Sequence, residues 1–289
     1  LPRIFWINKS KYQDRMLNMM IVAFVGKGGV GKTTIASAVA LSLAKEGKVA
    51  LVSSDFMPSL KYLFREVQEN LEVIEITESE MAKKWKARYG SEVFVILNNL
   101  FDVDEWIIDH IASSPGVAEE FLISGITDLD MSMKYDYVVW DTAASSSTMH
   151  LILLQKEFYD HLSRDVKIYL KLRDVIHSDK ILDILEQWKE LAQRVWRQLL
   201  DSKFFLVTNG DELSIVQAGE INEDLYKMGI KVSGLICNRS PGKCNNNAII
   251  SIPEFTGSAR EIVDKISRTI TENKEVLSVL RSRNEQKVL

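Results

Sequence analysis

One glycine-rich segment limits what this chain can fold into more than any other feature of its sequence. It spans residues 26–34, Gly-Lys-Gly-Gly-Val-Gly-Lys-Thr-Thr, between an apolar run at 21–25 and a helix-forming stretch at 35–41. A strand, a glycine loop and a helix in that order provide the context that a phosphate-binding loop requires. Glycines let successive backbone N–H groups converge on phosphate oxygens, and the N-terminus of the helix adds further donors. The segment therefore predicts a phosphate-binding loop rather than a simple turn before a helix.

The side chains of this loop have separate predicted roles. Lys32 is expected to reach the β- and γ-phosphates of a nucleoside triphosphate, and the Thr33 hydroxyl is expected to ligate Mg²⁺. The backbone and the neighbouring side chains should complete the phosphate site, which then comprises Gly26, Lys27, Gly28, Gly29, Val30, Gly31, Lys32, Thr33 and Thr34.

Two aspartates follow apolar strand patterns farther along the chain. Asp55 comes shortly after the run 48–52, and Asp141 ends the run 135–141. A hydrophobic strand that ends in aspartate is a pattern in which the carboxylate orients Mg²⁺ or its water ligands. In a doubly wound sheet the ligand lies outside the carboxyl ends of the strands, so both carboxylates should face the loop. We therefore predict a metal site of Thr33, Asp55 and Asp141, with Asp55 also orienting the attacking water; the alternative for Asp55 is a helix cap.

Strand and helix patterns alternate through the chain and predict its fold class. Besides the runs already named, strand patterns lie at 71–76, 203–208, 232–237 and 249–252, and helical patterns at 32–46, 78–130, 165–200 with a break near 177–179, 212–228 and from 258 onward. This alternation predicts an α/β P-loop NTPase fold with a mostly parallel, doubly wound sheet flanked by helices, with 71–76 as an edge strand. Helical elements at about 78–130 and 150–200 should add a layer or subdomain. We predict one P-loop domain over residues 19–289 and assign 1–18 to an N-terminal extension without chemistry.

Composition narrows the class of protein. The chain has 289 residues, a formal net charge of −4 and two cysteines, Cys237 and Cys244. An acidic balance argues against a surface devoted to nucleic acid, and no apolar run approaches the roughly 18–20 residues that a membrane span needs. Two cysteines do not indicate a disulfide framework, so reduced thiols fit better. We therefore expect a cytoplasmic protein and do not expect nucleic acid among its partners.

Lys27, the second residue of the loop, is typical of the deviant Walker A pattern Gly-Lys-Gly-Gly-x-Gly-Lys-Thr. The sequence resembles the class of P-loop ATPases that carry this pattern, which includes partition ATPases, the nitrogenase iron protein and the arsenical-pump and tail-anchored-protein targeting ATPases. In that class the first lysine contacts the nucleotide held by the partner subunit. The resemblance therefore implies ATP and Mg²⁺ as cofactors and a nucleotide-dependent homodimer in which Lys27 acts catalytically across the interface. The alternative for Lys27 is a solvated loop lysine.

Motifs beyond the loop resemble one branch of this class. Residues 53–60 with Phe64 resemble its switch I, 114–120 resemble its Pro-Gly-x-x-Glu segment, and 141–143 followed by Thr148 resemble its switch II. The branch is the arsenical pump-driving (ArsA) and tail-anchored-protein targeting (GET) ATPase family, and the similarity runs from about residue 21 to residue 262. The small polar stretch 142–148 suits a loop that moves when the γ-phosphate leaves.

The same resemblance implies an adenine site. Asn238, within the sequence Cys-Asn-Arg at 237–239, matches the asparagine with which the family recognises adenine. Pro253 and Glu254 lie where the family has a late adenine-side loop. We therefore add Asn238, Pro253 and Glu254 to the expected nucleotide contacts.

Some positions depart from this branch. Residues 56–58 read Phe-Met-Pro where the family has Pro-Ala-His, and residues 144–147 read Ala-Ser-Ser-Ser where it has Pro-Thr-Gly-His. The cysteine pair that binds interfacial zinc in targeting members is absent, because Cys244 has no Cys-x-x-Cys partner. Asp55 and Asp141 are retained, so metal handling and water positioning stay in place while the coupling of the switches can differ.

The resemblance implies hydrolysis of Mg·ATP coupled to the opening and closing of a homodimer. One role is a targeting ATPase whose closed dimer shields a tail-anchored or other hydrophobic membrane-protein client between helices from about 82–121 and 151–200, and hands it to a membrane receptor. The alternative is a ParA/MinD-like positioning or partition ATPase that acts on DNA or membrane, which the acidic composition disfavours. The structural alternative for 78–130 is a helical layer that only covers one face of the sheet.

Overall fold

A computed structural model describes residues 20–55, 60–66, 68–114, 117–131, 134–143, 145–176, 179–240 and 248–282. The predicted extension 1–18 lies outside these residues. So do residues 56–59 of the predicted switch I, residues 115–116 of the segment that resembles Pro-Gly-x-x-Glu, and Cys244.

The described residues form a sheet of seven strands, and every neighbouring pair runs parallel. The strands are β1 (Met20–Val25), β2 (Val49–Ser53), β3 (Leu71–Glu75), β4 (Tyr137–Asp141), β5 (Lys203–Thr208), β6 (Val232–Cys237) and β7 (Ala248–Ser251). They lie in the order β3-β2-β4-β1-β5-β6-β7, with β1 in the middle and β3 at an edge, as the sequence predicted. Each of the strands β1 to β5 is followed by at least one helix, which confirms the doubly wound α/β class.

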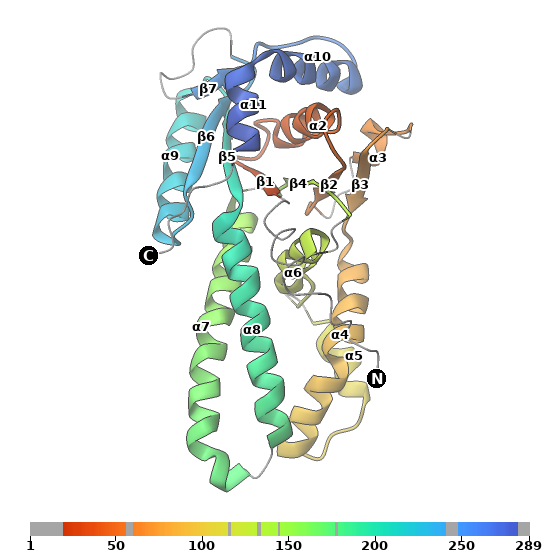
Figure 1. Cartoon of the computed structure of the whole chain (residues 1–289), viewed down its shortest axis with the longest axis vertical. Helices are drawn as coiled ribbons and strands as arrows, with labels where there is room; N and C mark the ends of the chain where they lie inside the picture. Colours follow the sequence, from red (N-terminus) through yellow and green to blue (C-terminus); the bar gives the residue numbers. More distant parts are fainter. Residues whose placement is uncertain are drawn as a thin grey trace.

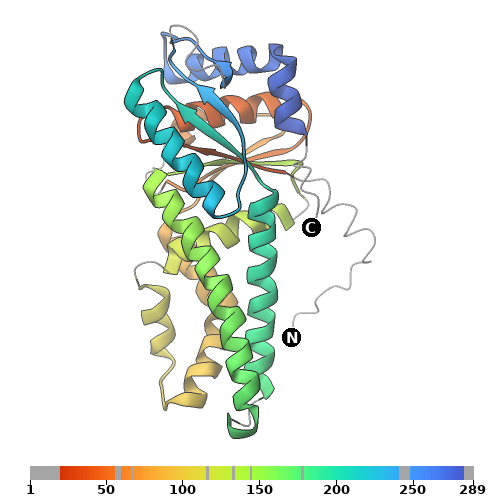
Figure 2. The ribbon, with the colours of Figure 1, turned by 90° about the vertical axis from the view of Figure 1, so that its left-hand side faces the viewer.

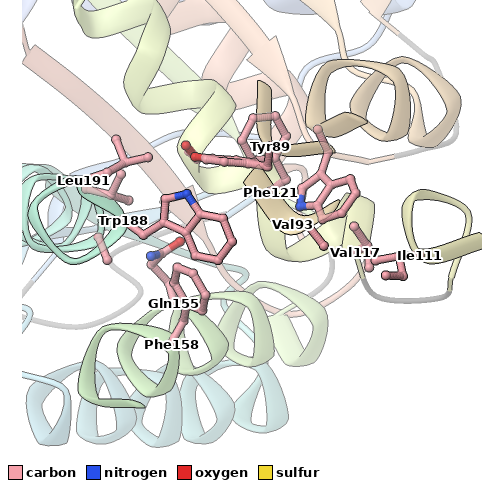
Figure 3. Close-up of a pocket in the computed structure, with 13 residues that line it drawn as sticks. Tyr89, Val93, Ile111, Val117, Phe121, Gln155, Phe158, Trp188 and Leu191 are labelled. Atoms are coloured by element: carbon pink, nitrogen blue, oxygen red, sulfur yellow. The ribbon is translucent and has the colours of Figure 1, made fainter. Parts of the chain in front are cut away.

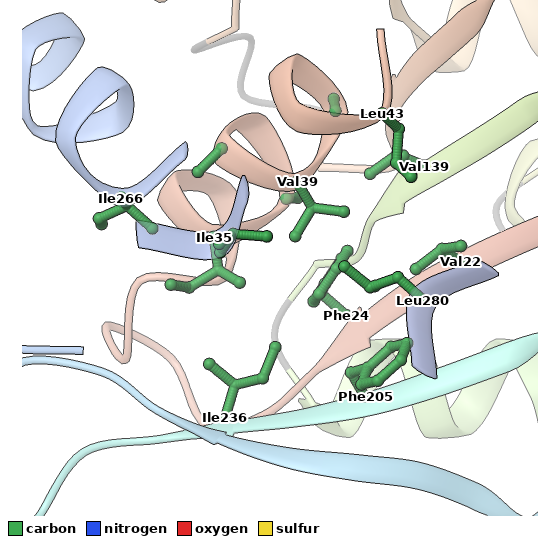
Figure 4. Packing of buried hydrophobic residues seen from close by; sticks show 14 of the residues in the cluster. Val22, Phe24, Ile35, Val39, Leu43, Val139, Phe205, Ile236, Ile266 and Leu280 are labelled. Carbon is green, nitrogen blue, oxygen red and sulfur yellow. The ribbon is translucent and has the colours of Figure 1, made fainter. Parts of the chain in front are cut away.

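One face of the sheet is covered by α2 (Lys32–Leu43), α10 (Ala259–Glu272) and α11 (Lys274–Arg281), drawn above the strands in Figure 1. Aliphatic side chains of α2 such as Val39 pack against Phe24 of β1 and Phe205 of β5, whose rings stack at 5.8 Å (Figure 4). The central strands β1, β2, β4 and β5 are buried from both sides, which explains why they read as continuous apolar runs rather than as alternating ones.

The other face carries a second apolar cluster and most of the helices. They are α4 (Glu78–Leu100), α5 (Trp106–Ala112), α6 (Val117–Met131), α7 (Ser145–Ile176), α8 (Asp179–Asp201) and α9 (Glu212–Lys227). Figures 1 and 2 show that α7 and α8 form a long hairpin that extends away from the sheet, with α4 and α5 extending in the same direction. We call α4 to α8 the helical layer. A short helix, α3 (Leu60–Leu63), precedes edge strand β3.

Two predictions were wrong in detail. Residues 142–148 were expected to be a loop, but α7 begins at Ser145 and so starts well before the expected position 165. Serine and threonine near a helix start can bond local backbone groups, as Thr148 does by donating to Ala143 O at 3.3 Å. Cys237 is fully buried as expected of a core residue, yet it is disulfide-bonded rather than a reduced thiol. Among the helices that the structure describes, none has both the length and the apolarity of a membrane span.

Candidate functional site

The carboxyl ends of the strands meet at one edge of the sheet, because all the strands run parallel. The glycine loop follows β1 at this edge, and Asp141 ends β4 beside it, with Phe24 and Ser53 as its register partners on β1 and β2. Asp55 lies just beyond the end of β2. The fold therefore brings together the glycine loop, Asp55 and Asp141, as the sequence predicted.

The conformation of the glycine loop requires glycine at particular positions. Gly29 and Gly31 have φ angles of +84° and +92°, in the left-handed region that L side chains rarely adopt. Gly26 lies against the end of β5, where an added Cβ would come within 2.2 Å of Val207 O. The loop then enters α2, and Ile35 N–H donates to Gly31 O at 3.0 Å. Within the described part of the chain, no side chain caps the start of α2, and the first N–H groups of a helix have no acceptor within it, so an anion would be stabilised there.

Lys32 lies beneath the loop at the first position of α2. Its ammonium group donates to Gly26 O at 3.1 Å and to Lys27 O at 3.2 Å, and the side chain is buried. Burial lowers the pKa of Lys32, while the charges of Asp141 and Asp55 act in the opposite direction. The ammonium group is thus held at the site by the loop carbonyls, within the electrostatic field of both aspartates.

Asp141 is the most deeply buried acidic group of the site, with an exposed fraction of 1%. Burial raises its pKa from 3.8 to about 7, although hydrogen bonds from the Thr33 and Ser53 hydroxyl groups and the charge of Lys32 oppose the shift. Its Oδ1 atom is buried and makes no hydrogen bond. An unsatisfied carboxylate oxygen next to a threonine hydroxyl is the oxygen-ligand chemistry that Mg²⁺ prefers. Thr33 and Asp141 therefore fit the predicted metal, either directly or through water.

The raised pKa of Asp141 gives a testable pH dependence. The folded protein binds the Asp141 proton more tightly than the unfolded chain, so its stabilising contribution is present at low pH and is lost as the pH rises through about 7. In the absence of metal and nucleotide, we expect the free energy of unfolding to fall from about pH 4 to about pH 7 more steeply for the wild type than for Asp141→Asn, and to level off above that range. Urea unfolding in chelator measures this difference. The exposed control Asp102→Asn should keep the wild-type slope, and parallel curves for wild type and Asp141→Asn would contradict the assignment.

Asp55 is exposed at the edge, and its N–H group donates to Ser53 Oγ at 3.2 Å. The next described helix, α3, begins at Leu60, and its first N–H groups have another acceptor. Glu75 Oε1 of β3 accepts from Leu60 N–H at 2.8 Å and from Lys61 N–H at 3.2 Å. The start of α3 is therefore held by Glu75. The charge of Asp55 acts on both Lys32 and Asp141, which places its carboxylate within electrostatic reach of the site.

Three residues around Asp55 were not predicted from the sequence. Ser54 N–H donates to Asp141 O at 3.1 Å, and the buried Trp140 indole donates to Ser54 Oγ at 2.9 Å. Together with Glu75, which accepts bonds at the start of α3, these bonds hold the backbone on both sides of Asp55. The sequence offered no signal for them, since each joins strands that are far apart in the chain.

The remaining predicted residues lie at the rim of the same edge. Lys27 is half-buried. The pKa of Asp211, at the start of α9, is lowered chiefly by a hydrogen bond from Ser214 and to a smaller extent by the charge of Lys27. Pro253 and Glu254 are exposed beyond the end of β7. Asn238 is buried, and its amide nitrogen donates to Val30 O of the glycine loop at 2.9 Å, a contact that the sequence did not predict.

A separate apolar cavity of about 280 Å³ lies within the helical layer (Figure 3). Side chains from all five of its helices line it: Trp85, Tyr89, Val93, Ile111, Val117, Phe121, Ser124, Gln155, Phe158, Trp188, Leu191, Ala192 and Val195. Tyr89 meets the rings of Phe121 and Trp188 edge-on at 5.5 and 5.8 Å. The cavity is thus an aromatic-walled space, with charged groups of the described residues only behind its walls, where the Trp188 indole donates to Glu92 and Arg88 lies over the Tyr89 ring at 5.5 Å.

Comparisons with known proteins agree with this arrangement. The family model described as "Anion-transporting ATPase" matches residues 19–280. The chain is 30% identical over 241 residues to a "Putative arsenical pump-driving ATPase 2" of Aquifex aeolicus, covering 76% of this chain and 80% of that relative. It is 26% identical to a "Putative arsenical pump-driving ATPase" of Chlorobaculum tepidum, covering 76% of this chain and 61% of that relative. It is 24% identical to an "ATPase ASNA1 homolog" of Plasmodium vivax, over 96% of this chain and 79% of that relative.

Proposed function

Because this chain belongs to the anion-transporting ATPase family and is an ATP hydrolase, we propose that it uses Mg²⁺ and that its nucleotide-gated homodimer carries hydrophobic segments of membrane proteins. Its place of action would be the cytoplasm. Its partners would be a second copy of the chain, an apolar client helix and a membrane receptor.

The edge of the sheet supports the ATPase part of this proposal. Lys32 would leave the carbonyl groups of Gly26 and Lys27 and bind the β- and γ-phosphates, which replaces two neutral acceptors by charged ones. Thr33 and Asp141 would hold Mg²⁺, which neutralises charge on the phosphate oxygens when it is bound. Asp55 would orient the attacking water from the exposed side. Lys27, on the outer part of the loop, would reach the nucleotide of the second copy.

The apolar cavity in the helical layer is the observation that carries the client part of the proposal. A cavity walled by Tyr89, Phe121 and Trp188 offers mainly apolar contact, which suits the side chains of a membrane-spanning helix. Exposed aromatic residues extend this apolar character along the same layer, since Phe101 and Trp106 are 64% and 62% exposed. Exposed aromatic side chains of this kind are typical of surfaces that bind a partner.

Co-expression with a client tests this proposal. A substrate with a C-terminal transmembrane helix should co-purify with the Asp55→Asn variant in the presence of ATP and should be lost with Lys32→Ala. Phe158 lines the cavity and is 37% exposed, so Phe158→Asp should place a charge at the apolar surface with little effect on folding. We expect this variant to hydrolyse ATP normally. It should retain less than about a tenth of the client, because a bound client would bury the unpaired charge of the aspartate, which costs several kcal/mol.

A matched control is available on α9. Tyr226 is 80% exposed and lies outside the cavity, so Tyr226→Asp should retain the client. Equal loss in both variants would mean that the cavity is not the client site. If dimers form with ATP but no client co-purifies with them, the ATPase part of the proposal stands and the ParA/MinD-like positioning role is favoured.

A further inference from the structure

The two sides of the glycine loop have different neighbours. Phosphate binding requires the N–H groups of the loop to face the ligand, so its carbonyl groups must be satisfied from the other side. Lys32 occupies the carbonyl groups of Gly26 and Lys27. The next carbonyl groups, those of Gly29 and Val30, accept from residues beyond the ends of β5 and β6.

Asn238 makes the closest of these contacts. Its side-chain nitrogen donates to Val30 O at 2.9 Å, and the side chain is 2% exposed. The same nitrogen lies so close to Gly31 that a Cβ there would come within 2.4 Å of it. Asn238 is itself fixed, because its N–H group donates to Thr208 O at 2.7 Å. Arg239 adds a longer bond from Nη1 to Gly29 O at 3.4 Å.

Asn209 reaches the same carbonyl group from β5. With its amide nitrogen turned toward the loop, Asn209 donates to Val30 O and to the backbone oxygen of Asn238, each at 3.3 Å. In that orientation Val30 O receives two amide donors, Asn238 from just beyond β6 and Asn209 from just beyond β5. Val30 is buried, and a buried carbonyl group is costly when its donors are removed.

We infer that Asn209 and Asn238 are positioning residues of the glycine loop: they bind its carbonyl side and so keep its N–H side turned toward the triphosphate. This role differs from the adenine contact that the family resemblance implies for Asn238, because it does not depend on a base. It also assigns a role to Asn209, which the sequence motifs left out. The inference depends on the proposed function only for the identity of the ligand.

A phosphate ligand that lacks a base distinguishes support of the glycine loop from recognition of adenine. We expect Asn209→Ala and Asn238→Ala each to weaken binding of Mg·ATP and of Mg·tripolyphosphate by the same factor of about ten, the effect of losing one typical hydrogen bond. Calorimetric titration measures both affinities. The control Asn273→Ala removes a cap of α11, where Asn273 Oδ1 accepts from Val276 N–H at 3.1 Å, and should change neither affinity. Weaker ATP binding with unchanged tripolyphosphate binding would overturn the inference, because the asparagines would then read the base.

Hydrogen exchange of the ligand-free protein provides a second measurement. The N–H groups of residues 28–32 should exchange faster in both variants than in the wild type and in Asn273→Ala, since the loop has lost its support. If the wild type binds neither Mg·ATP nor Mg·tripolyphosphate, the proposed function fails. Hydrogen exchange still tests whether the two asparagines support the loop. Unchanged exchange in both variants would overturn the inference. Should Asn238→Ala fail to fold, Asn209→Ala carries both measurements alone.

Discussion

Lys32→Ala should lower the rate of ATP hydrolysis by about 10²–10³-fold or more, because it removes the positive charge nearest to the phosphates from a site with little water. No other ammonium group of the described residues lies under the loop with bonds to Gly26 O and Lys27 O. Steady-state turnover and nucleotide binding measure the effect. Lys45, just beyond the end of the same helix, is exposed, and Lys45→Ala should hydrolyse ATP at the wild-type rate.

This variant should lose activity without losing stability. Burial lowers the pKa of Lys32, which means that the folded protein holds the charged form at a cost. Replacing it with an apolar side chain removes that cost but also removes the donor to Gly26 O and Lys27 O, so the melting temperature of the ligand-free protein should change by only a few degrees. Loss of activity together with a large fall in melting temperature would mean that Lys32 acts through the fold. Turnover within a few-fold of the wild type would remove it from the phosphate site.

Asp55→Asn should bind ATP and hydrolyse it about 10²–10⁴-fold more slowly, the range expected when a group that positions or deprotonates water is lost. The side chain is exposed and the main-chain bonds at Ser53 and Ser54 do not involve its carboxylate, so the segment should keep its position. Single-turnover hydrolysis and light scattering with ATP measure the two parts of the result. We expect dimers to accumulate with ATP, because the state before hydrolysis persists.

Two comparisons make this result specific. Asp102→Asn changes an exposed carboxylate in the helical layer and should leave turnover unchanged. Adding Lys27→Ala to Asp55→Asn should prevent the ATP-dependent dimer if Lys27 acts across the interface. Near-normal turnover in Asp55→Asn would remove Asp55 from its role, and slow turnover without a dimer would separate the ATPase from the proposed switch.

Local patterns predicted most of the fold and the main residues of the site. A buried parallel strand is a short apolar run, so β5 and β6 were found at their observed bounds. The glycine loop and Asp141 were found because each belongs to a pattern within one strand and its following turn. In each of these cases the residues of the sequence pattern lie within a few positions of the structural element or site that the pattern predicts.

The contacts that hold the site in place could not be found in this way. Asn238 and Val30 are 208 positions apart in the chain, and Trp140 and Ser54 are 86 positions apart. A single sequence does not show which polar side chain of one strand end reaches which backbone group of another. The early start of α7 was missed for a different reason, since its first turn consists of serine and threonine residues that are common in loops and at helix starts alike.

The position of α7 has a mechanical consequence. The helix begins shortly after Asp141 at the end of β4, and Gln155 and Phe158 of the same helix line the apolar cavity. The distance from Ser145 to Phe158 along the helix is roughly 20 Å at 1.5 Å per residue. A helix is stiff over that length, so a tilt at its first turn displaces the far residues in proportion to their distance. A change in the backbone just after Asp141 that tilted α7 would therefore shift Gln155 and Phe158 at the cavity.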